Sequence, residues 1–195
     1  LKPPLLVPNL EIIAGREEAR LIYLGVSHTT AAGGRRLVVD IGGGSTEFII
    51  GQDFEPLQTE SLQMGCVAFT RKFFADGQIS AQAFEQAKNA ARKEVTVIAA
   101  IYRETGWDTV IGSSGTIKAA RQLLMQQGLA DEQGYITYPA LLKLREQILK
   151  WKHADEIDFE GLKEDRKAVL PAGLAILIGL FEVLGIERMG YSDGA

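Results

Sequence analysis

The stretch Leu37-Val38-Val39-Asp40-Ile41-Gly42-Gly43-Gly44-Ser45-Thr46-Glu47-Phe48-Ile49-Ile50-Gly51 decides the fold of this chain. Two runs rich in β-branched residues flank three consecutive glycines, and such runs joined by a short glycine-rich link predict a β-hairpin. Because glycine lacks a Cβ, its backbone N–H can come close to a ligand, and successive N–H groups form a concavity that suits a phosphate. We therefore expect a hairpin whose tip, made by Gly42, Gly43, Gly44 and Ser45, binds a phosphate group.

Polar residues on both sides of the glycines favour this interpretation over a tight turn without a ligand. Asp40 precedes the glycines, where an Mg²⁺ ion bound to the phosphate would need an oxygen ligand. Thr46 adds a hydroxyl and Glu47 adds a second carboxylate. The stretch lacks the Gly-Lys-Ser/Thr of a Walker loop, and its glycines lead into a strand rather than a helix, so it is not a Rossmann fingerprint either.

The composition limits the possible partners and the compartment. The 195 residues are 46% hydrophobic, which permits a substantial core, and the net charge of −4 argues against general binding of nucleic acid. The single cysteine, Cys66, excludes an intramolecular disulfide and is typical of a reducing, cytoplasmic location, where we expect it to be buried. The most apolar segment, 168–184, is too short for a membrane span and contains Pro171 and Glu182.

The residues before the hairpin predict a strand at Leu5–Ala14, a helix at Arg16–Leu24 and a loop at Ser27–Gly34. Glu17 and Glu18 stand in the first turn of that helix. Acidic residues there either complement the helix dipole or serve catalysis, and the local sequence leaves both explanations open. After the hairpin, we expect a third antiparallel strand at 54–64.

A second candidate anion site follows further along the chain. Ser80 predicts the N-cap of a long amphipathic helix that ends near Gly106. A strand at 107–112 then leads into the small-residue loop 113–116 and a helix from Ile117 to about Gln127. Such a loop is an ordinary N-cap or an anion site, and the glycine-rich loop earlier in the chain favours the anion site.

The last third of the chain predicts two helices, an acidic loop and a strand. Thr137 predicts the cap of a helix, and the segment 155–165 predicts an exposed acidic loop. The apolar segment 168–184 predicts a buried helix that ends at Gly185, and the segment 187–191 predicts a final strand. Arg166 and Lys167 precede the buried helix, where positive charge opposes the helix dipole, and they indicate an anion nearby.

This order of elements resembles one half of the actin, hexokinase and Hsp70 superfamily, an α/β, actin-like ATPase (ribonuclease H-like) fold with a mixed sheet flanked by helices. Within it, the chain resembles the exopolyphosphatase and guanosine pentaphosphate phosphohydrolase (Ppx/GppA) family. The matching segments run in the family's order over almost the whole chain: 15–21, 38–47, 64–67, 112–119, 171–177 and 192–195.

The resemblance implies roles for particular residues. Glu18 is expected to be the catalytic base and Glu47 a second catalytic carboxylate, while Asp40, together with Glu47, is expected to hold Mg²⁺. Gly42, Gly43, Gly44 and Ser45 would form the family's second phosphate loop. Gly115 and Thr116 occupy the loop that holds a nucleotide in kinases of the superfamily. Arg166 would contact the polyanion; Arg92 and Lys93 lie near where the family has another basic contact.

The resemblance also implies an activity and a missing partner. It implies a hydrolase that releases terminal orthophosphate from polyphosphate or guanosine pentaphosphate, and the sequence does not decide between these substrates. Residues 1–195 would form a single domain, which is the second half of a two-lobed catalytic core. This domain would be inactive without the N-terminal lobe, and the full-length protein could form a homodimer. A small-molecule kinase and a non-enzymatic nucleotide-binding sensor remain the alternatives.

Overall fold

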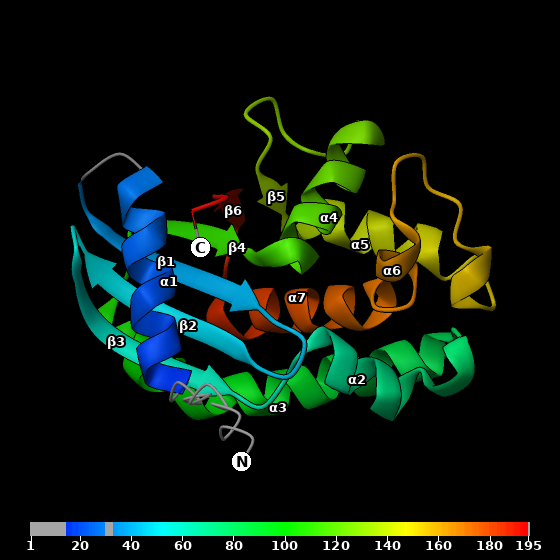
Figure 1. Cartoon of the computed structure of the whole chain (residues 1–195), viewed down its shortest axis with the longest axis horizontal. Helices are drawn as coiled ribbons and strands as arrows, with labels where there is room; N and C mark the ends of the chain where they lie inside the picture. The colour runs from blue at the N-terminus through cyan, green and yellow to red at the C-terminus, as the bar shows by residue number, and fades with distance from the viewer. Residues whose placement is uncertain (1–14, 30–32, 195) are drawn as a thin grey trace, which may run out of the picture.

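A computed structural model describes residues 15–29 and 33–194, and its centre is a six-stranded mixed sheet (Figure 1). The strand order is β3-β2-β1-β4-β6-β5. β1 pairs antiparallel with β2 and parallel with β4, β2 pairs antiparallel with β3, and β6 pairs parallel with β4 and antiparallel with β5. The bounds are β1 (Arg35–Ile41), β2 (Thr46–Gln52), β3 (Glu55–Leu62), β4 (Thr109–Ser113), β5 (Ile136–Thr137) and β6 (Arg188–Tyr191). The predicted α/β fold with a mixed sheet is confirmed.

The predicted hairpin is present, and its register sets which side chains share a face. β1 and β2 pair continuously from Arg35 opposite Gln52 to Ile41 opposite Thr46. Successive side chains of a strand point to opposite faces. Val39 and Ile41 therefore pack in the larger core, while Val38 and Ile49 pack in the smaller one beneath α1. Asp40 and Glu47 follow the alternation of Val38 and Ile49, so both carboxylates lie on the α1 face.

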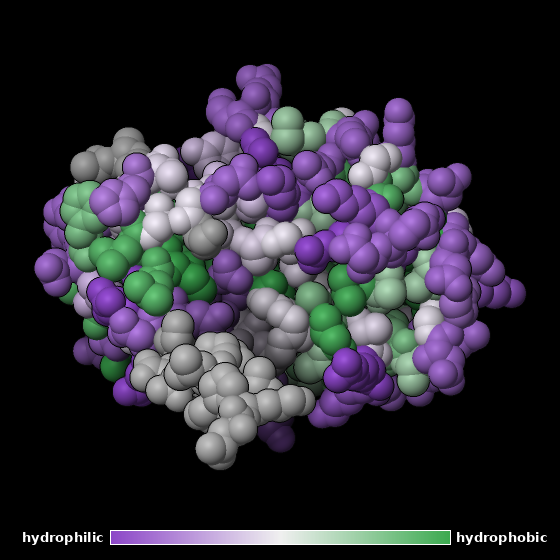
Figure 2. Space-filling model, in the orientation of Figure 1, coloured by the Kyte–Doolittle hydropathy of each residue, from purple (hydrophilic) through white to green (hydrophobic). Residues whose placement is uncertain are grey.

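Helix α1 (Gly15–Thr29) covers that face of the sheet, as Figure 1 shows. It buries Ala19, Tyr23 and Val26 against Val38 and Ile49. The helix continues three residues into the segment predicted as a loop from Ser27, because the Thr29 hydroxyl bonds both to the Val26 carbonyl and to the Ser192 hydroxyl. Apolar residues gather on the surface over α1 in Figure 2, and Leu21 is 45% exposed there. The strand predicted at Leu5–Ala14 lies outside the described residues.

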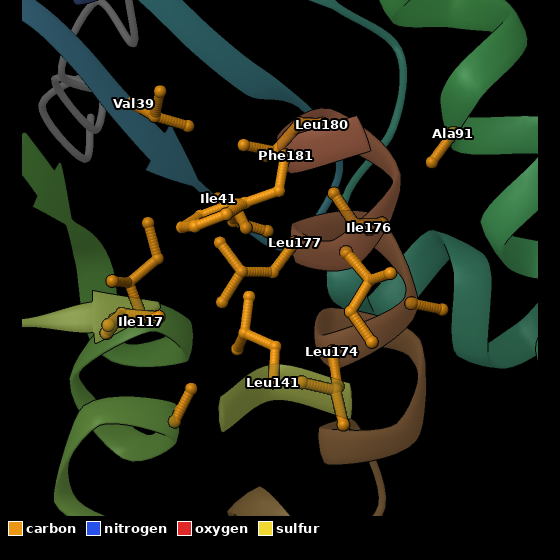
Figure 3. Packing of buried hydrophobic residues seen from close by; sticks show 14 of the residues in the cluster. Val39, Ile41, Ala91, Ile117, Leu141, Leu174, Ile176, Leu177, Leu180 and Phe181 are labelled. Carbon is orange, nitrogen blue, oxygen red and sulfur yellow. The ribbon is translucent and has the colours of Figure 1, made fainter. Parts of the chain in front are cut away.

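Helix α7 (Leu170–Leu184) is the centre of the larger core, on the opposite face of the sheet. Its side chains, among them Leu174, Leu177 and Phe181, gather with Ile41 from β1 and with residues of α4 and α5 (Figure 3). Gly185 ends the helix in the left-handed region at φ 69°, which suits glycine. The prediction of a largely buried helix is confirmed, although it begins at Leu170 rather than Ala168.

The other helices surround α7 and the sheet. The Ser80 hydroxyl accepts a hydrogen bond from the Ala83 N–H, and the predicted long helix ends at Gly106 as expected. The predicted loop 113–116 is wrong, because Ser114 to Thr116 form the first helical turn. The segment 155–165 is only partly exposed, since Ile157 and Phe159 are buried. The helices are α2 (Cys66–Phe73), α3 (Ala81–Thr105), α4 (Ser114–Gln126), α5 (Tyr138–Ile148) and α6 (Glu164–Lys167), with short 3₁₀ turns η1 (Ala75–Gly77) and η2 (Ala154–Glu156).

The sequence patterns did not predict α2 or β5. Cys66 is buried at the start of α2, as expected. Within residues 15–29 and 33–194, no helix is long and apolar enough to cross a membrane.

Candidate active site

The ends of β1 and β4 bring the candidate residues to one edge of the sheet. In open α/β sheets, ligands bind beyond the carboxyl ends of the parallel strands. Asp40 stands near the end of β1, beside Ser113 of β4 and directly opposite Glu47 of β2. The glycine loop between β1 and β2 continues from this edge, so the two carboxylates and the loop form one site.

The glycine loop is held so that two of its N–H groups stay available. The Gly42 N–H donates to the Ser45 carbonyl at 2.9 Å, which closes the turn. The carbonyls of Gly42 and Gly43 accept hydrogen bonds of 2.9–3.0 Å from the first N–H groups of α2. In a trans peptide the N–H points opposite to the C=O. The N–H groups of Gly43 and Gly44 therefore point away from α2, and both glycines are exposed.

Gly65 makes this arrangement possible, although no local pattern in the sequence predicts a role for it. A Cβ added at Gly65 would lie 2.4 Å from the carbonyl of Gly43 and from the backbone nitrogen of Gly44. The hydroxyl of Thr46 donates to the Met64 carbonyl at 2.5 Å and fixes the same crossing. The sequence offers one related signal, because Gly65 belongs to the Met-Gly-Cys-Val segment at 64–67 that matches the family.

The two strand carboxylates lie in surroundings that disfavour their charge. Burial, reinforced by the negative charge of Glu47, raises the pKa of Asp40 to about 6, although a hydrogen bond with Ser113 opposes the shift. Burial also raises the pKa of Glu47, which is 2% exposed, against hydrogen bonds with Ser45 and Ser61. The Ser61 hydroxyl donates to Glu47 Oε1 at 2.8 Å. Shifted carboxylates that share a site are typical of functional positions.

Helix α1 brings Glu18 to the same carboxylates. Its charge contributes to the raised pKa of both Asp40 and Glu47. The helix begins against β3, where a Cβ added at Gly15 would lie 2.7 Å from the Cβ of Ser61. Ser61 thus connects the start of α1 to Glu47. Glu18 is exposed.

The residues of the second loop form the facing wall of a pocket. This site pocket, of about 460 Å³, lies between the glycine loop and the start of α4. A Cβ added at Gly115 would lie 2.8–2.9 Å from the guanidinium of Arg166, so this arginine covers the first turn of α4. Thr116 is buried, and its methyl packs against Gly173 of α7. The predicted residues that line the pocket are Asp40, Gly42, Gly43, Gly115, Thr116 and Arg166.

The other predicted residues lie around the pocket or away from it. Ser45 closes the glycine turn and Glu47 faces Asp40, but neither lines the pocket, nor do Gly44 and Glu18. Arg92 and Lys93 do not line it either. Arg92 pairs instead with Glu182 of α7 at 3.2 Å.

The carboxylates of the site decide whether it fits Mg²⁺. Among the described residues, no group of three or more His, Cys, Asp or Glu side chains is placed to hold a metal ion. Mg²⁺ commonly takes only one or two carboxylates and fills its other positions with water and substrate phosphates. Asp40 and Glu47, adjacent and partly stripped of water, fit that mode.

Two known proteins are similar to this chain over almost its whole length. A protein of Haemophilus influenzae that carries the provisional name exopolyphosphatase is 48% identical over 186 residues, which are 95% of this chain and 57% of that protein. A guanosine-5′-triphosphate,3′-diphosphate pyrophosphatase of Vibrio parahaemolyticus is 46% identical over 186 residues, 95% of this chain and 37% of that protein. This chain therefore spans about a third to three fifths of the relatives' length.

A solved structure shows the same fold. The crystal structure of the Ppx/GppA phosphatase of Aquifex aeolicus superimposes with a TM-score of 0.79 at 25% identity, over 92% of this chain and 60% of that one. The sequence signature described as the Ppx/GppA phosphatase family matches residues 7–195. On this match and these relatives, the chain belongs to the Ppx/GppA phosphatase family.

Proposed function

We propose that this chain supplies catalytic carboxylates and one phosphate-binding wall for the hydrolysis of a phosphoanhydride. The substrate would be inorganic polyphosphate or guanosine pentaphosphate, and the product terminal orthophosphate. The observation that carries the proposal is the placement of Asp40 and Glu47 opposite each other beside a loop whose Gly43 and Gly44 N–H groups are available. The names of the relatives from Haemophilus influenzae and Vibrio parahaemolyticus support these two substrates.

In this mechanism the glycine loop holds and orients the terminal phosphate, while Glu18 is the base that takes a proton from the attacking water. The water oxygen attacks the terminal phosphorus, its proton passes to Glu18, and the bond from phosphorus to the bridging oxygen breaks. The electron pair of that bond leaves with the shortened substrate. Hydrolysis of a phosphoanhydride depends mainly on positioning and on neutralising charge, which N–H groups and Arg166 would provide.

Mg²⁺ held by Asp40 and Glu47 would neutralise charge on the phosphate oxygens. The relatives extend well beyond the matched length, and we propose that residues 1–195 act as one lobe of a two-lobed core whose other lobe supplies the facing wall. Cys66, reduced and buried, is compatible with the cytoplasm as the place of action.

The test is release of orthophosphate from long polyphosphate and from guanosine pentaphosphate by the full gene product, with Mg²⁺ present. We expect release from at least one substrate, and loss of release in the double variant Asp40→Asn/Glu47→Gln. The matched control, Asp158→Asn/Glu160→Gln, changes two exposed acids of the segment before α6 and should keep the activity. No release from either substrate, or full release by the first double variant, would overturn the proposal.

A further inference from the structure

A second pocket adjoins the site pocket and has a different chemical character. This side pocket, of about 300 Å³, lies between α4 and the segment that leads into α6, two elements that face each other in Figure 1. Gly115 and Arg166 line both pockets, so the two cavities share a wall. Its lining residues are Gly115, Lys118, Ala119, Gln122, Leu123, Gln126, Gly161, Leu162, Lys163 and Arg166.

The polar lining of the side pocket consists of three cationic side chains and two amides, without an aspartate or glutamate. Lys163 is exposed and has no ion pair with any residue in the described part of the chain. Arg166 pairs with the carboxylate of Asp165 at 3.8 Å, a long ion pair on the surface that offsets its positive charge only in part. Lys118 is different, because it pairs with Asp193 at 2.7 Å. In a chain with a net charge of −4, this is a local concentration of positive charge.

Arg166 connects the two pockets because Gly115 leaves room for its guanidinium. The guanidinium occupies the space that a side chain at position 115 would fill. Its planar fork of donors can contact phosphate oxygens on either side. An anion in the site pocket and a second anion in the side pocket would therefore share Arg166. The amide groups of Gln122 and Gln126 can donate further hydrogen bonds to the second anion.

We propose that the side pocket binds a second phosphate group of the same substrate, beyond the terminal phosphate that is cleaved. This inference rests on the proposed function. The second group would be an inner phosphate of polyphosphate or the 3′-diphosphate of guanosine pentaphosphate. The two candidate groups share the same chemistry, because each is a phosphate with several negatively charged oxygens that accept hydrogen bonds. Lys163, Arg166 and the two glutamines can recognise such oxygens.

The test compares Lys163→Gln with Lys150→Gln, which removes an exposed lysine that lines neither pocket. Substrate affinity is measured on the full gene product by titration calorimetry, and kcat/KM is measured from the release of orthophosphate. Two substrate pairs are used: pyrophosphate, which has no inner phosphate, against long polyphosphate, and GTP, which lacks the 3′-diphosphate, against guanosine pentaphosphate. We expect Lys163→Gln to weaken the affinity and kcat/KM for the longer member of a pair about tenfold and to leave the shorter member within about twofold. Lys163→Arg, which keeps the charge, should restore the wild-type ratio.

The outcomes separate the two proposals. Absence of phosphate release by the wild-type protein would overturn the proposed function, whatever the affinities are. Release by the wild type with equal effects of Lys163→Gln and Lys150→Gln, or with equal losses for short and long substrates, would overturn the side-pocket assignment alone. A loss confined to the polyphosphate pair would identify inner phosphates as the second group, and a loss confined to the nucleotide pair would identify the 3′-diphosphate.

Discussion

Asp40 and Glu47 are direct cross-strand partners on β1 and β2, and both lie on the sheet face that α1 covers. Like charges opposite each other on neighbouring strands destabilise a sheet. Here burial disfavours the charged forms further, and the pKa of each carboxyl is raised. The pair therefore lowers the stability of the fold, as is often found at a functional site where the charged groups bind a ligand.

This pair gives a prediction for stability as a function of pH. The pKa of Asp40 is about 6 in the folded chain against 3.8 as its ordinary value. Between these pH values the folded chain keeps a proton that the unfolded chain has released, so stability falls as pH rises from about 4 to about 6. Asp40→Asn removes this penalty. We expect it to raise the free energy of unfolding at pH 7 by up to about 3 kcal/mol, with no gain near pH 4.

Urea unfolding of residues 1–195 at pH 4, 5, 6 and 7, with a chelator present, measures this effect. Asp158→Asn is the control, because that residue is exposed in the segment before α6. A gain from Asp40→Asn that is equal at pH 4 and pH 7 would contradict the assignment of the shifted pKa to Asp40.

Mg²⁺ gives a second prediction, because a cation between the two carboxylates would relieve the same repulsion. Added Mg²⁺ should raise the melting temperature of the wild-type protein, and the rise should be lost in Asp40→Asn/Glu47→Gln. Below pH 6 the protonation of Asp40 should weaken the effect. Thermal unfolding in a series of Mg²⁺ concentrations, with K⁺ added to match the ionic strength, is the measurement. An equal rise in the double variant would place the bound Mg²⁺ elsewhere.

Glu18 and Glu17 provide a matched pair for the third prediction. They are neighbours in the first turn of α1, and both are exposed. Glu17 pairs with Arg20 at 2.7 Å, whereas the charge of Glu18 contributes to the raised pKa of Asp40 and Glu47. If Glu18 is the base, Glu18→Gln in the full gene product should lower kcat by about 10²–10⁴-fold and keep substrate affinity.

Glu17→Gln should keep the rate. Dipole complementation, the other explanation for acids in this turn, predicts a small and similar loss of stability in both variants and almost no loss of rate. Rates and melting temperatures of the two variants decide between these explanations. A near-wild-type rate in Glu18→Gln would end its assignment as the base.

The sequence predicted the sheet centre and the buried helix because local patterns specify them. β-branched runs around Gly42 to Gly44 specify the hairpin, and an apolar segment ending at Gly185 specifies α7. The helix ends were harder to predict. Thr29 extends α1 through a bond to Ser192, a partner 163 residues away that no local rule can anticipate.

The site was predictable as a set of residues but not as an arrangement. Asp40, Glu47 and the glycine loop are contiguous, so they could be proposed together, whereas the approach of Arg166 to Gly115 joins segments about 50 residues apart through tertiary packing. Gly65 was missed for the same reason. Its importance depends on the backbone that crosses it, and that backbone belongs to a different part of the chain.

Gly65 gives the last prediction, which tests how the phosphate loop is held. In Gly65→Ala the new methyl would overlap the Gly43–Gly44 peptide, and that peptide cannot move without loosening the hydrogen bonds from α2. We expect the free energy of unfolding to fall by about 1–3 kcal/mol, as overpacking usually costs. Gly44→Ala is the control for stability, because a Cβ there meets no atom within 4 Å and should change the free energy of unfolding by less than about 0.5 kcal/mol. Urea unfolding measures both variants, and titration with inorganic phosphate reports whether the displaced loop still binds an anion. Equal stabilities of the two variants would show that the loop accommodates the methyl, and that Gly65 is not what holds the Gly43 and Gly44 N–H groups in place.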